Sequence, residues 1–278
     1  MVKTIRDALQ IAYQQLHPSH TKRLDAQLLL CHLLNVEKPY LVTHDDRILS
    51  NQEITDFQAL IARRQNDEPV AYILGYKHFW DLVFAVSPAV LIPRPETEHL
   101  IEAALEWVKG KNELIVADIG TGSGAIAVTI AKHTNATVYA VDISPAALEI
   151  ARKNATDNQV DIHFHEGSLA SPLIEQAIKV DLLLANLPYI RADVMPDLPV
   201  TKHEPSLALV GGEDGLDLVR DLILQIPQVC NPNALILLEI GMEQYQAVRE
   251  FAEAHLVTKD IRIIKDLAGL DRIVAIQL

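Results

Sequence analysis

Apolar residues recur with helical spacing through the first seventy or so positions of the chain. The first predicted helix carries four apolar residues on one face: Ile5, Leu9, Ala12 and Leu16. Residues 21–35 carry a broader apolar stripe with the same period, which is typical of a helix that packs against others. A third helix is predicted to begin at Ser50, because Ser50 and Glu53 have the S-x-x-E spacing of a capping box. We therefore expect a small N-terminal helical bundle over residues 1–72.

The pattern changes after residue 72. Residues 73–95 are rich in aromatic and β-branched residues and are interrupted by Gly75 and three prolines. We expect a connector that contains a short β-hairpin. A helix is then predicted from Pro95 to about Lys109, because proline is favoured in the first turn of a helix.

Beyond residue 110, strand-like and helix-like segments alternate. The strand-like segments are 113–120, 136–143, 160–167, 180–189 and 234–241, and the helix-like ones are 124–133, 144–158, 216–229 and 244–255. This alternation predicts βαβ units and a parallel sheet with helices on both faces. Residues 261–278 have the pattern of two strands around a glycine-containing turn, which predicts an antiparallel hairpin at one edge. The expected fold of residues 96–278 is α/β, with a seven-stranded, mostly parallel sheet.

Composition and charge narrow the function only modestly. The chain has 278 residues, of which 49% are hydrophobic and 22% charged, close to the average of globular proteins. The apolar positions of its first segment are interrupted by polar ones, unlike a signal peptide or a membrane span, so we expect a cytoplasmic protein without membrane contact. The formal net charge of −13 disfavours direct binding of nucleic acid, because an acidic surface repels phosphate. Cys31 and Cys230 lie far apart and the histidines show no metal-ligand spacing, so no metal site is expected.

A glycine-rich turn follows the first strand of the alternating region, in "VADIGTGSGAIAV", and Asp118 precedes it. The turn consists of Gly120, Thr121, Gly122, Ser123 and Gly124. Glycines allow a sharp turn and bring backbone N–H groups close to a ligand, and the following helix adds its positive dipole. The spacing is G-x-G-x-G, which differs from the dinucleotide fingerprint G-x-G-x-x-G. Asp118 would repel a pyrophosphate and suits a cationic ligand.

A second acid ends the next strand, in "AVDIS". Asp142 lies eighteen positions beyond Gly124, where a carboxylate can accept both hydroxyls of a ribose. S-adenosylmethionine contains an adenosine and a positive sulfur and has no phosphate, so it fits both Asp118 and Asp142, whereas NAD fits only Asp142. The two acids therefore predict S-adenosylmethionine as the cofactor.

The apolar run "LLLANLPYI", residues 182–190, ends in a polar turn. A continuous apolar run predicts a strand covered on both faces, so Asn186 falls at the carboxyl edge of the parallel sheet. Open α/β folds bind their ligands at that edge.

Four segments together resemble a known family: "EPVAYILG", "LIPRPETE", "ANLPY" and "HEPSLALVGGEDGLD". With the glycine turn and "AVDIS", they resemble the bacterial peptide chain release factor N5-glutamine methyltransferases, which are class I S-adenosylmethionine-dependent enzymes. The resemblance runs from about Asp25 to the C-terminus. It implies a Rossmann-like methyltransferase domain at residues 96–278 and an N-terminal domain at residues 1–72 that helps to hold the release factor. The implied reaction is methylation of the side-chain amide of the glutamine in the GGQ tripeptide.

The resemblance assigns residues to the cofactor and to the substrate. The cofactor residues are the loop Gly120 to Gly124, Asp142, Ser168, Leu169 and Asn186. The substrate residues are Asn186, Leu187, Pro188 and Tyr189, with Asn186, Pro188 and Tyr189 expected to act in catalysis. Arg94, in "IPRPETE", is our candidate for a further substrate residue; the alternative is that this segment only stiffens the chain.

Two residues depart from the family pattern. Ser168 and Leu169 stand where many relatives have an acid and a bulky residue near the adenine, and Leu187 stands where relatives usually have proline. A serine can still form hydrogen bonds, and a leucine keeps the backbone carbonyl of its position.

The expected chemistry is orientation and electrostatic stabilisation. An amide nitrogen is a poor nucleophile, so it must be held in line with the S–CH₃ bond while its N–H groups bind acceptors. The Asn186 side-chain oxygen offers one acceptor and a backbone carbonyl of the turn offers a second, while Tyr189 can stack on the amide. We expect neither a metal nor a strong base.

Two other functions remain open from the sequence. One is a related N-methyltransferase of a ribosomal-protein glutamine or of adenine in nucleic acid, because an exocyclic amine presents the same planar NH₂ group. The other is a catalytically inactive, cofactor-binding adaptor, which Leu187 alone suggests.

Overall fold

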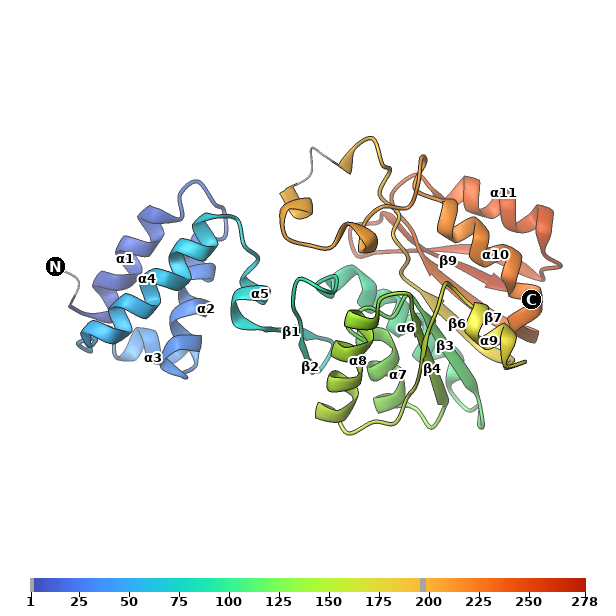
Figure 1. The fold of residues 1–278 in the computed structure, drawn as a ribbon, viewed down its shortest axis with the longest axis horizontal. Helices are drawn as coiled ribbons and strands as arrows, with labels where there is room; N and C mark the ends of the chain where they lie inside the picture. The colour runs from blue at the N-terminus through green and yellow to red at the C-terminus, as the bar shows by residue number, and fades with distance from the viewer. Residues whose placement is uncertain (1–2, 196–198) are drawn as a thin grey trace. The chain divides into compact units, whose positions relative to one another are not determined.

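The computed structural model describes residues 3–195 and 199–278, and the chain divides into two compact units, Met1–Tyr76 and Lys77–Leu278 (Figure 1). Each unit has hydrophobic core residues of its own. Within the described ranges, no helix is long and apolar enough to cross a membrane.

The first unit is helical. It contains α1 (Ile5–Gln15), α2 (Lys22–Leu34), α3 (Lys38–Thr43), α4 (Asn51–Gln65) and α5 (Val70–Leu74). The predicted capping box is present, because Ser50 Oγ accepts from the Glu53 N–H at 3.2 Å and the Glu53 carboxylate accepts from the Ser50 N–H at 2.7 Å. Periodicity does not predict α3 and α5, since helices this short contain too few apolar repeats to detect.

A two-stranded hairpin, β1 (Tyr76–Phe79) and β2 (Leu82–Ala85), lies within residues 73–95. Asn154 fixes its end, because Asn154 Oδ1 accepts from the Ala85 N–H at 2.7 Å and Asn154 Nδ2 donates to the Ala85 carbonyl at 3.0 Å. The chain then continues through η1 (Pro95–Thr97) into α6 (Glu98–Val108).

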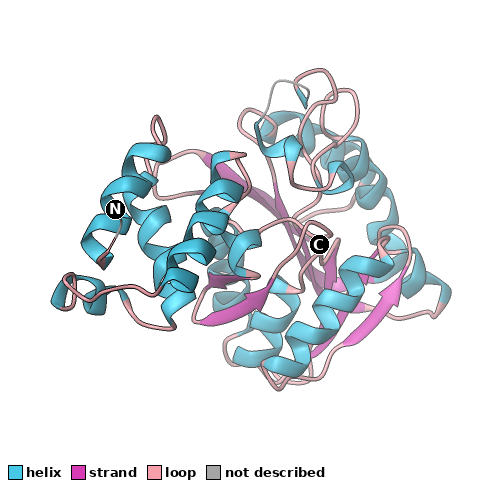
Figure 2. Cartoon of the chain, turned by 60° about the vertical axis from the view of Figure 1, so that its left-hand side comes forward, coloured by secondary structure: helices cyan, strands magenta, loops and turns pink. Residues whose placement is uncertain are grey.

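The second unit is built on a seven-stranded sheet with the order β5-β4-β3-β6-β7-β9-β8. Figure 2 shows strands of the chain with helices beside them. Its strands are β3 (Ile115–Ile119), β4 (Thr137–Asp142), β5 (His163–Glu166), β6 (Val180–Ala185), β7 (Cys230–Glu239), β8 (Asp260–Lys265) and β9 (Asp271–Gln277). Strands β3 to β7 pair in parallel, whereas β9 pairs antiparallel with both β7 and β8. The predicted fold class, including the C-terminal hairpin at the sheet edge, is confirmed.

Helices cover both faces of this sheet. One face packs against α6, α7 (Ala125–His133) and α8 (Pro145–Asp157), and the other against α9 (Ser171–Glu175), α10 (Asp217–Val229) and α11 (Tyr245–His255). Along β6 the side chains alternate: Leu182 and Leu184 join the first core, and Leu183 and Ala185 join the second. Because both faces are buried, the strand appears in the sequence as a continuous apolar run.

The strand register aligns four positions at the carboxyl edge of the sheet. Ile119 pairs with Val141 of β4 and with Ala185 of β6, and Ala185 pairs with Leu238 of β7. One residue further along each strand, the row consists of Asp142, Gly120, Asn186 and Glu239. Strand β3 has its sequence neighbour β4 on one side and β6 on the other, so the order of the strands reverses at β3. Open α/β sheets bind their ligands at such a topological switch point.

Candidate functional site

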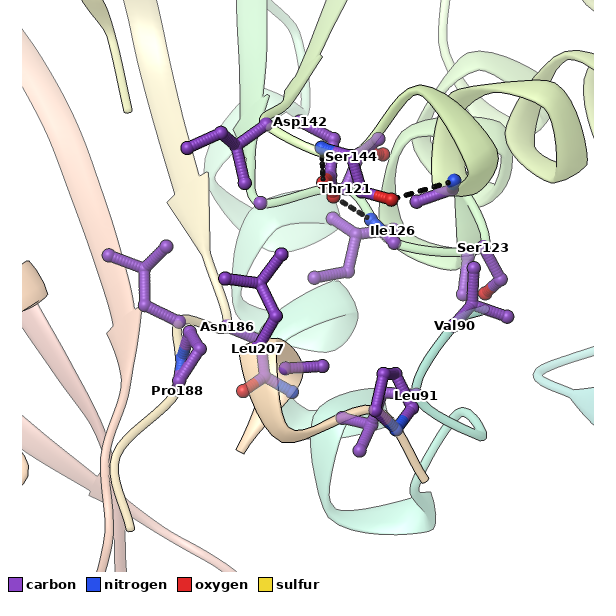
Figure 3. A pocket seen from close by; sticks show the side chains of 18 of the residues that line it. Val90, Leu91, Thr121, Ser123, Ile126, Asp142, Ser144, Asn186, Pro188 and Leu207 are labelled. Carbon is purple, nitrogen blue, oxygen red and sulfur yellow. Dashed lines mark hydrogen bonds between the residues drawn. The ribbon is translucent and has the colours of Figure 1, made fainter. Parts of the chain in front are cut away.

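A cavity of about 220 Å³ opens at the switch point of the sheet (Figure 3). One water molecule occupies roughly 10–15 Å³ of such space, so the cavity has room for a ligand of many atoms. The predicted site residues that line it are Arg94, Gly120, Thr121, Gly122, Ser123, Asp142, Ser168, Leu169, Asn186, Leu187 and Pro188. The predicted residues outside the lining are Asp118, Gly124 and Tyr189.

The glycine turn is fixed to β4 and approaches the turn after β6. The N–H groups of Gly120 and Thr121 both donate to the Val141 carbonyl, at 2.8 and 3.0 Å. Gly120 has φ +74°, a backbone conformation that favours glycine. A Cβ at Gly120 would lie 3.0 Å from Leu187 Cδ2, so the glycine also allows the two turns to touch.

Asp118 and Gly124 shape the turn and do not line the cavity, and their contact with the cofactor stays a prediction. Asp118 is fully buried, and its Oδ2 accepts the Thr121 hydroxyl at 2.6 Å and the Ala127 N–H at 3.1 Å. Burial raises the pKa of Asp118 to about 7. A Cβ at Gly124 would lie 3.1 Å from Ala151, so this glycine allows α7 and α8 to approach each other.

Asp142 ends β4 and faces the cavity. Its Oδ2 accepts the Gly122 N–H at 2.8 Å and its Oδ1 accepts the Ser144 N–H at 2.9 Å, which fixes the plane of the carboxylate. Each oxygen keeps a second lone pair that can accept a ligand hydroxyl. Burial raises the pKa of Asp142 above its ordinary value. Ser144 also caps α8, as predicted, by accepting the Ala147 N–H at 3.2 Å.

Asn186 reaches the cavity from the end of β6, as predicted. Figure 3 shows Asn186 and Pro188 at the end of the cavity opposite Asp142. Asn186 Nδ2 donates to Thr97 Oγ1 at 3.0 Å. The side chains of Asn186 and Thr97 also lower the pKa of the Glu239 carboxylate, which places both of them near it. The amide nitrogen is therefore bound to the protein, and Oδ1 remains as an acceptor.

Arg94 lines the cavity and is held by Glu204. Arg94 Nη2 donates to Glu204 Oε1 at 2.6 Å, and Glu204 Oε2 accepts the Ile92 N–H at 3.2 Å. The Glu204 side chain is only 2% exposed. The pair joins "LIPRPETE" to "HEPSLAL", so the first of these segments helps to form the cavity wall as well as stiffening the chain.

Tyr189 does not line the cavity, and its stacking on the substrate amide stays a prediction. A Cβ at Gly241 would lie 3.3 Å from Tyr189 Cδ2, so the ring packs closely on Gly241. Burial and the charge of Glu239 raise the pKa of Tyr189 to about 12. Gln244 Nε2 donates to the Tyr189 carbonyl at 3.1 Å. Tyr189 therefore supports the turn in this structure.

Three polar residues that hold site side chains in place were not identified from the sequence: Thr97, Glu204 and Glu239. Glu239 ends the apolar run "ALILLEIG" just as Asn186 ends "LLLAN", so the same argument about strand ends finds it. Thr97 and Glu204 lie in motifs that carry the family resemblance, but only the fold brings them next to Asn186 and Arg94.

The sheet order, the glycine turn after β3 and the carboxylate that ends β4 together define a class I methyltransferase. The solved structure of the Thermus thermophilus 16S rRNA N2 G1207 methyltransferase in complex with AdoMet and guanosine is similar in fold. Its TM-score is 0.54 at 16% identity, and the match covers 73% of this chain and 50% of that chain.

Two family models match the chain: "PrmC N-terminal domain" at residues 7–75 and "Ribosomal protein L11 methyltransferase (PrmA)" at residues 95–203. The release factor glutamine methyltransferase of Vibrio cholerae is 40% identical over 283 residues, which cover 98% of this chain and 96% of the relative. That of Bacillus anthracis is 36% identical over 276 residues, which cover 97% and 98%. The chain belongs to the release factor glutamine methyltransferase family.

Replacing Asp118 with Asn tests the environment of this buried carboxyl. Its folded pKa of about 7 exceeds the unfolded value near 3.9, so the folded protein binds more protons between these values. The stability that Asp118 contributes is thus fully present below about pH 4 and is lost as the pH rises to 7. The Asn side chain does not titrate. We therefore expect the unfolding free energy of Asp118→Asn, taken relative to wild type, to rise by roughly 1–3 kcal/mol as the pH goes from 5 to 8.

Urea unfolding followed by tryptophan fluorescence measures this difference, because Trp80 and Trp107 both lie in the second unit. The exposed acid Asp157 provides the control, since Asp157→Asn should show no such gain. A difference between Asp118→Asn and wild type that stays constant with pH would contradict the prediction.

Proposed function

We propose that this protein uses S-adenosylmethionine to methylate the side-chain amide nitrogen of the glutamine in the GGQ tripeptide of peptide chain release factors. The relatives of Vibrio cholerae and Bacillus anthracis, both named release factor glutamine methyltransferases, support this substrate. The observation that supports the proposal most directly is the hydrogen bonding of the Asn186 side-chain amide. Its nitrogen is bound to Thr97, and its oxygen remains for a substrate N–H at the cavity that Asp142 also lines.

The residues that line the cavity fit S-adenosylmethionine. We assign the ribose hydroxyls to Asp142, whose two oxygens are fixed by backbone N–H groups. Ser168 and Leu169 line the same cavity and are assigned to the adenine. When bound, the cofactor supplies an electrophilic methyl group on a sulfonium.

Two acceptors bind the substrate amide in this proposal. Asn186 Oδ1 is the first. Among the carbonyls of the turn, that of Tyr189 is bound by Gln244, and that of Pro188 faces Gly211, where a Cβ would lie 2.4 Å away. We therefore assign the second acceptor to the Leu187 carbonyl.

The acceptors orient the nitrogen and stabilise the positive charge that develops on it. The amide proton becomes acidic only as the new bond forms, so the mechanism uses neither a strong base nor a metal. Leu187 is 4% exposed and packs in the core, and this packing replaces the rigidity of the usual proline. Only Leu187 suggested the alternative of an inactive adaptor. A leucine retains the backbone carbonyl that the mechanism needs, so Leu187 does not favour that alternative.

We propose that residues 1–72 help to hold the release factor. The match of "PrmC N-terminal domain" to residues 7–75 supports a role specific to this family. A substrate that acts in translation also supports a cytoplasmic location. The second candidate substrate is a ribosomal protein, because the L11 methyltransferase model matches residues 95–203.

A parallel assay with methyl-labelled S-adenosylmethionine separates the candidate substrates. We expect label in a release factor and none in ribosomal protein L11 or duplex DNA, because the family match spans almost the whole chain. A release factor with the GGQ glutamine replaced by alanine is the matched control and should remain unlabelled. Label in L11 alone would favour the second candidate.

Alanine replacements at the two ends of the cavity should separate chemistry from cofactor binding. Asn186→Ala removes a substrate acceptor, so kcat should fall by about 100-fold or more while the Kd for S-adenosylmethionine changes little. Asp142→Ala removes the ribose acceptors, so that Kd should rise by about 10–100-fold. Calorimetry gives the Kd and the labelled assay gives kcat. Wild-type kcat in Asn186→Ala would refute the assigned acceptor.

A further inference from the structure

Glu239 is a buried carboxylate beside the catalytic turn that the proposed mechanism leaves without a role. It ends β7 in the same row as Asn186, which follows β6. Its residue surface is 1% exposed, and its Oε2 has no hydrogen-bond partner among the residues that the structure describes. A buried carboxylate is costly unless it is paired, so its retention beside Asn186 needs a reason.

Two polar side chains lie between this carboxylate and the cavity. Thr97 Oγ1 accepts from Asn186 Nδ2 at 3.0 Å. The side chains of Thr97 and Asn186 both lower the pKa of Glu239, so both lie near its carboxylate. Asn186 also lines the cavity.

We propose that Glu239 is a positioning residue for methyl transfer: directly and through Thr97, it holds the Asn186 amide with its oxygen, and not its nitrogen, facing the substrate. This inference rests on the proposed function, because it assumes that a substrate amide binds at Asn186.

The hydrogen-bond donors available to Glu239 and Thr97 select the orientation of Asn186. An ionised carboxylate only accepts hydrogen bonds, so in this proposal the Thr97 hydroxyl, which accepts from Asn186, donates its one hydrogen to Glu239. Toward Asn186 the hydroxyl can then only accept, so Asn186 must present its NH₂ group to Thr97. The two ends of an asparagine amide have nearly the same shape, so packing alone selects between them poorly. In the reversed orientation, the NH₂ group of Asn186 would face the NH₂ group of the substrate.

The ionisation of Glu239 determines whether this selection operates. Burial, the largest cause, raises the pKa of Glu239 to about 7, while hydrogen bonds and Arg272 lower it and Glu96 raises it. Arg272 Nη2 is itself paired with Asp266 at 3.0 Å. Tyr189, whose pKa is raised to about 12, stays neutral in this range. A protonated Glu239 can donate to Thr97, which frees the hydroxyl to donate to Asn186 and permits the reversed amide.

Replacing Glu239 with Gln tests the inference, because glutamine keeps the shape but can donate as well as accept. We expect kcat with release factor to fall by about 10–100-fold, with the Kd for S-adenosylmethionine unchanged. Wild-type kcat should rise with pH through an apparent pKa near 7, and Glu239→Gln should lack this step. Thr97→Val should reproduce the loss of kcat, and Thr97→Ser should restore it.

The control is Asp181→Asn, because Asp181 lies on β6 at the end of the sheet away from the cavity and accepts from the Ile115 N–H at 2.9 Å and from Asn231 Nδ2 at 2.8 Å. It should keep wild-type kcat and the wild-type pH profile.

A second readout does not depend on the substrate. The side-chain ¹⁵N–¹H signals of Asn186 should shift with pH through the titration of Glu239 in the free wild-type protein, and should not shift in Glu239→Gln. If wild type fails to methylate release factor, the proposed function is wrong, and these signals still decide whether Glu239 orients the Asn186 amide. The role of Glu239 would be overturned if Glu239→Gln kept the wild-type kcat and pH profile. It would also be overturned if the Asn186 signals of the wild-type protein did not shift with pH. If Glu239→Gln lost S-adenosylmethionine binding together with kcat, the role of Glu239 would be structural and not one of positioning Asn186.

Discussion

The hydrogen bond from Asn186 to Thr97 is the interaction on which the rest of the site depends. An asparagine side chain has a donor end and an acceptor end of nearly equal size, so its orientation decides whether the cavity binds or repels another amide. Strand β6 brings Asn186 to the sheet edge, and η1 brings Thr97 to the same point. Because this bond occupies the nitrogen, the oxygen faces the place where the substrate nitrogen must be held.

The parallel sheet sets the separation between the cofactor acid and this amide. Asp142 follows β4 and Asn186 follows β6, and β3 lies between them, so the two positions are roughly 10 Å apart. At the position between them is Gly120, which has no side chain to fill that space. A ligand can therefore extend from the carboxylate across β3 to the amide. Arg94 and Glu204 close the cavity from segments that the sheet does not supply.

Periodicity predicted the fold and the ends of the strands, and the resemblance to the family supplied most of the other cavity residues. A buried parallel strand has to end at the sheet edge, which is why Asn186 and Asp142 were placed there from the sequence. The same reasoning cannot say which way a side chain turns once the strand has ended. It therefore could not show that Asp118 accepts a hydrogen bond from Thr121 of the glycine turn, or that the Tyr189 ring packs on Gly241. The partner of Asn186, Thr97, is 89 positions away in the sequence, and no local pattern connects them.

The most direct test of this account is a crystal structure of the enzyme with S-adenosylhomocysteine and a release factor that carries the GGQ tripeptide. The account predicts that Asn186 Oδ1 lies within about 3.2 Å of the glutamine side-chain nitrogen, with Asn186 Nδ2 still bound to Thr97. A glutamine amide that meets Asn186 through its oxygen, or that binds away from the turn after β6, would contradict the account.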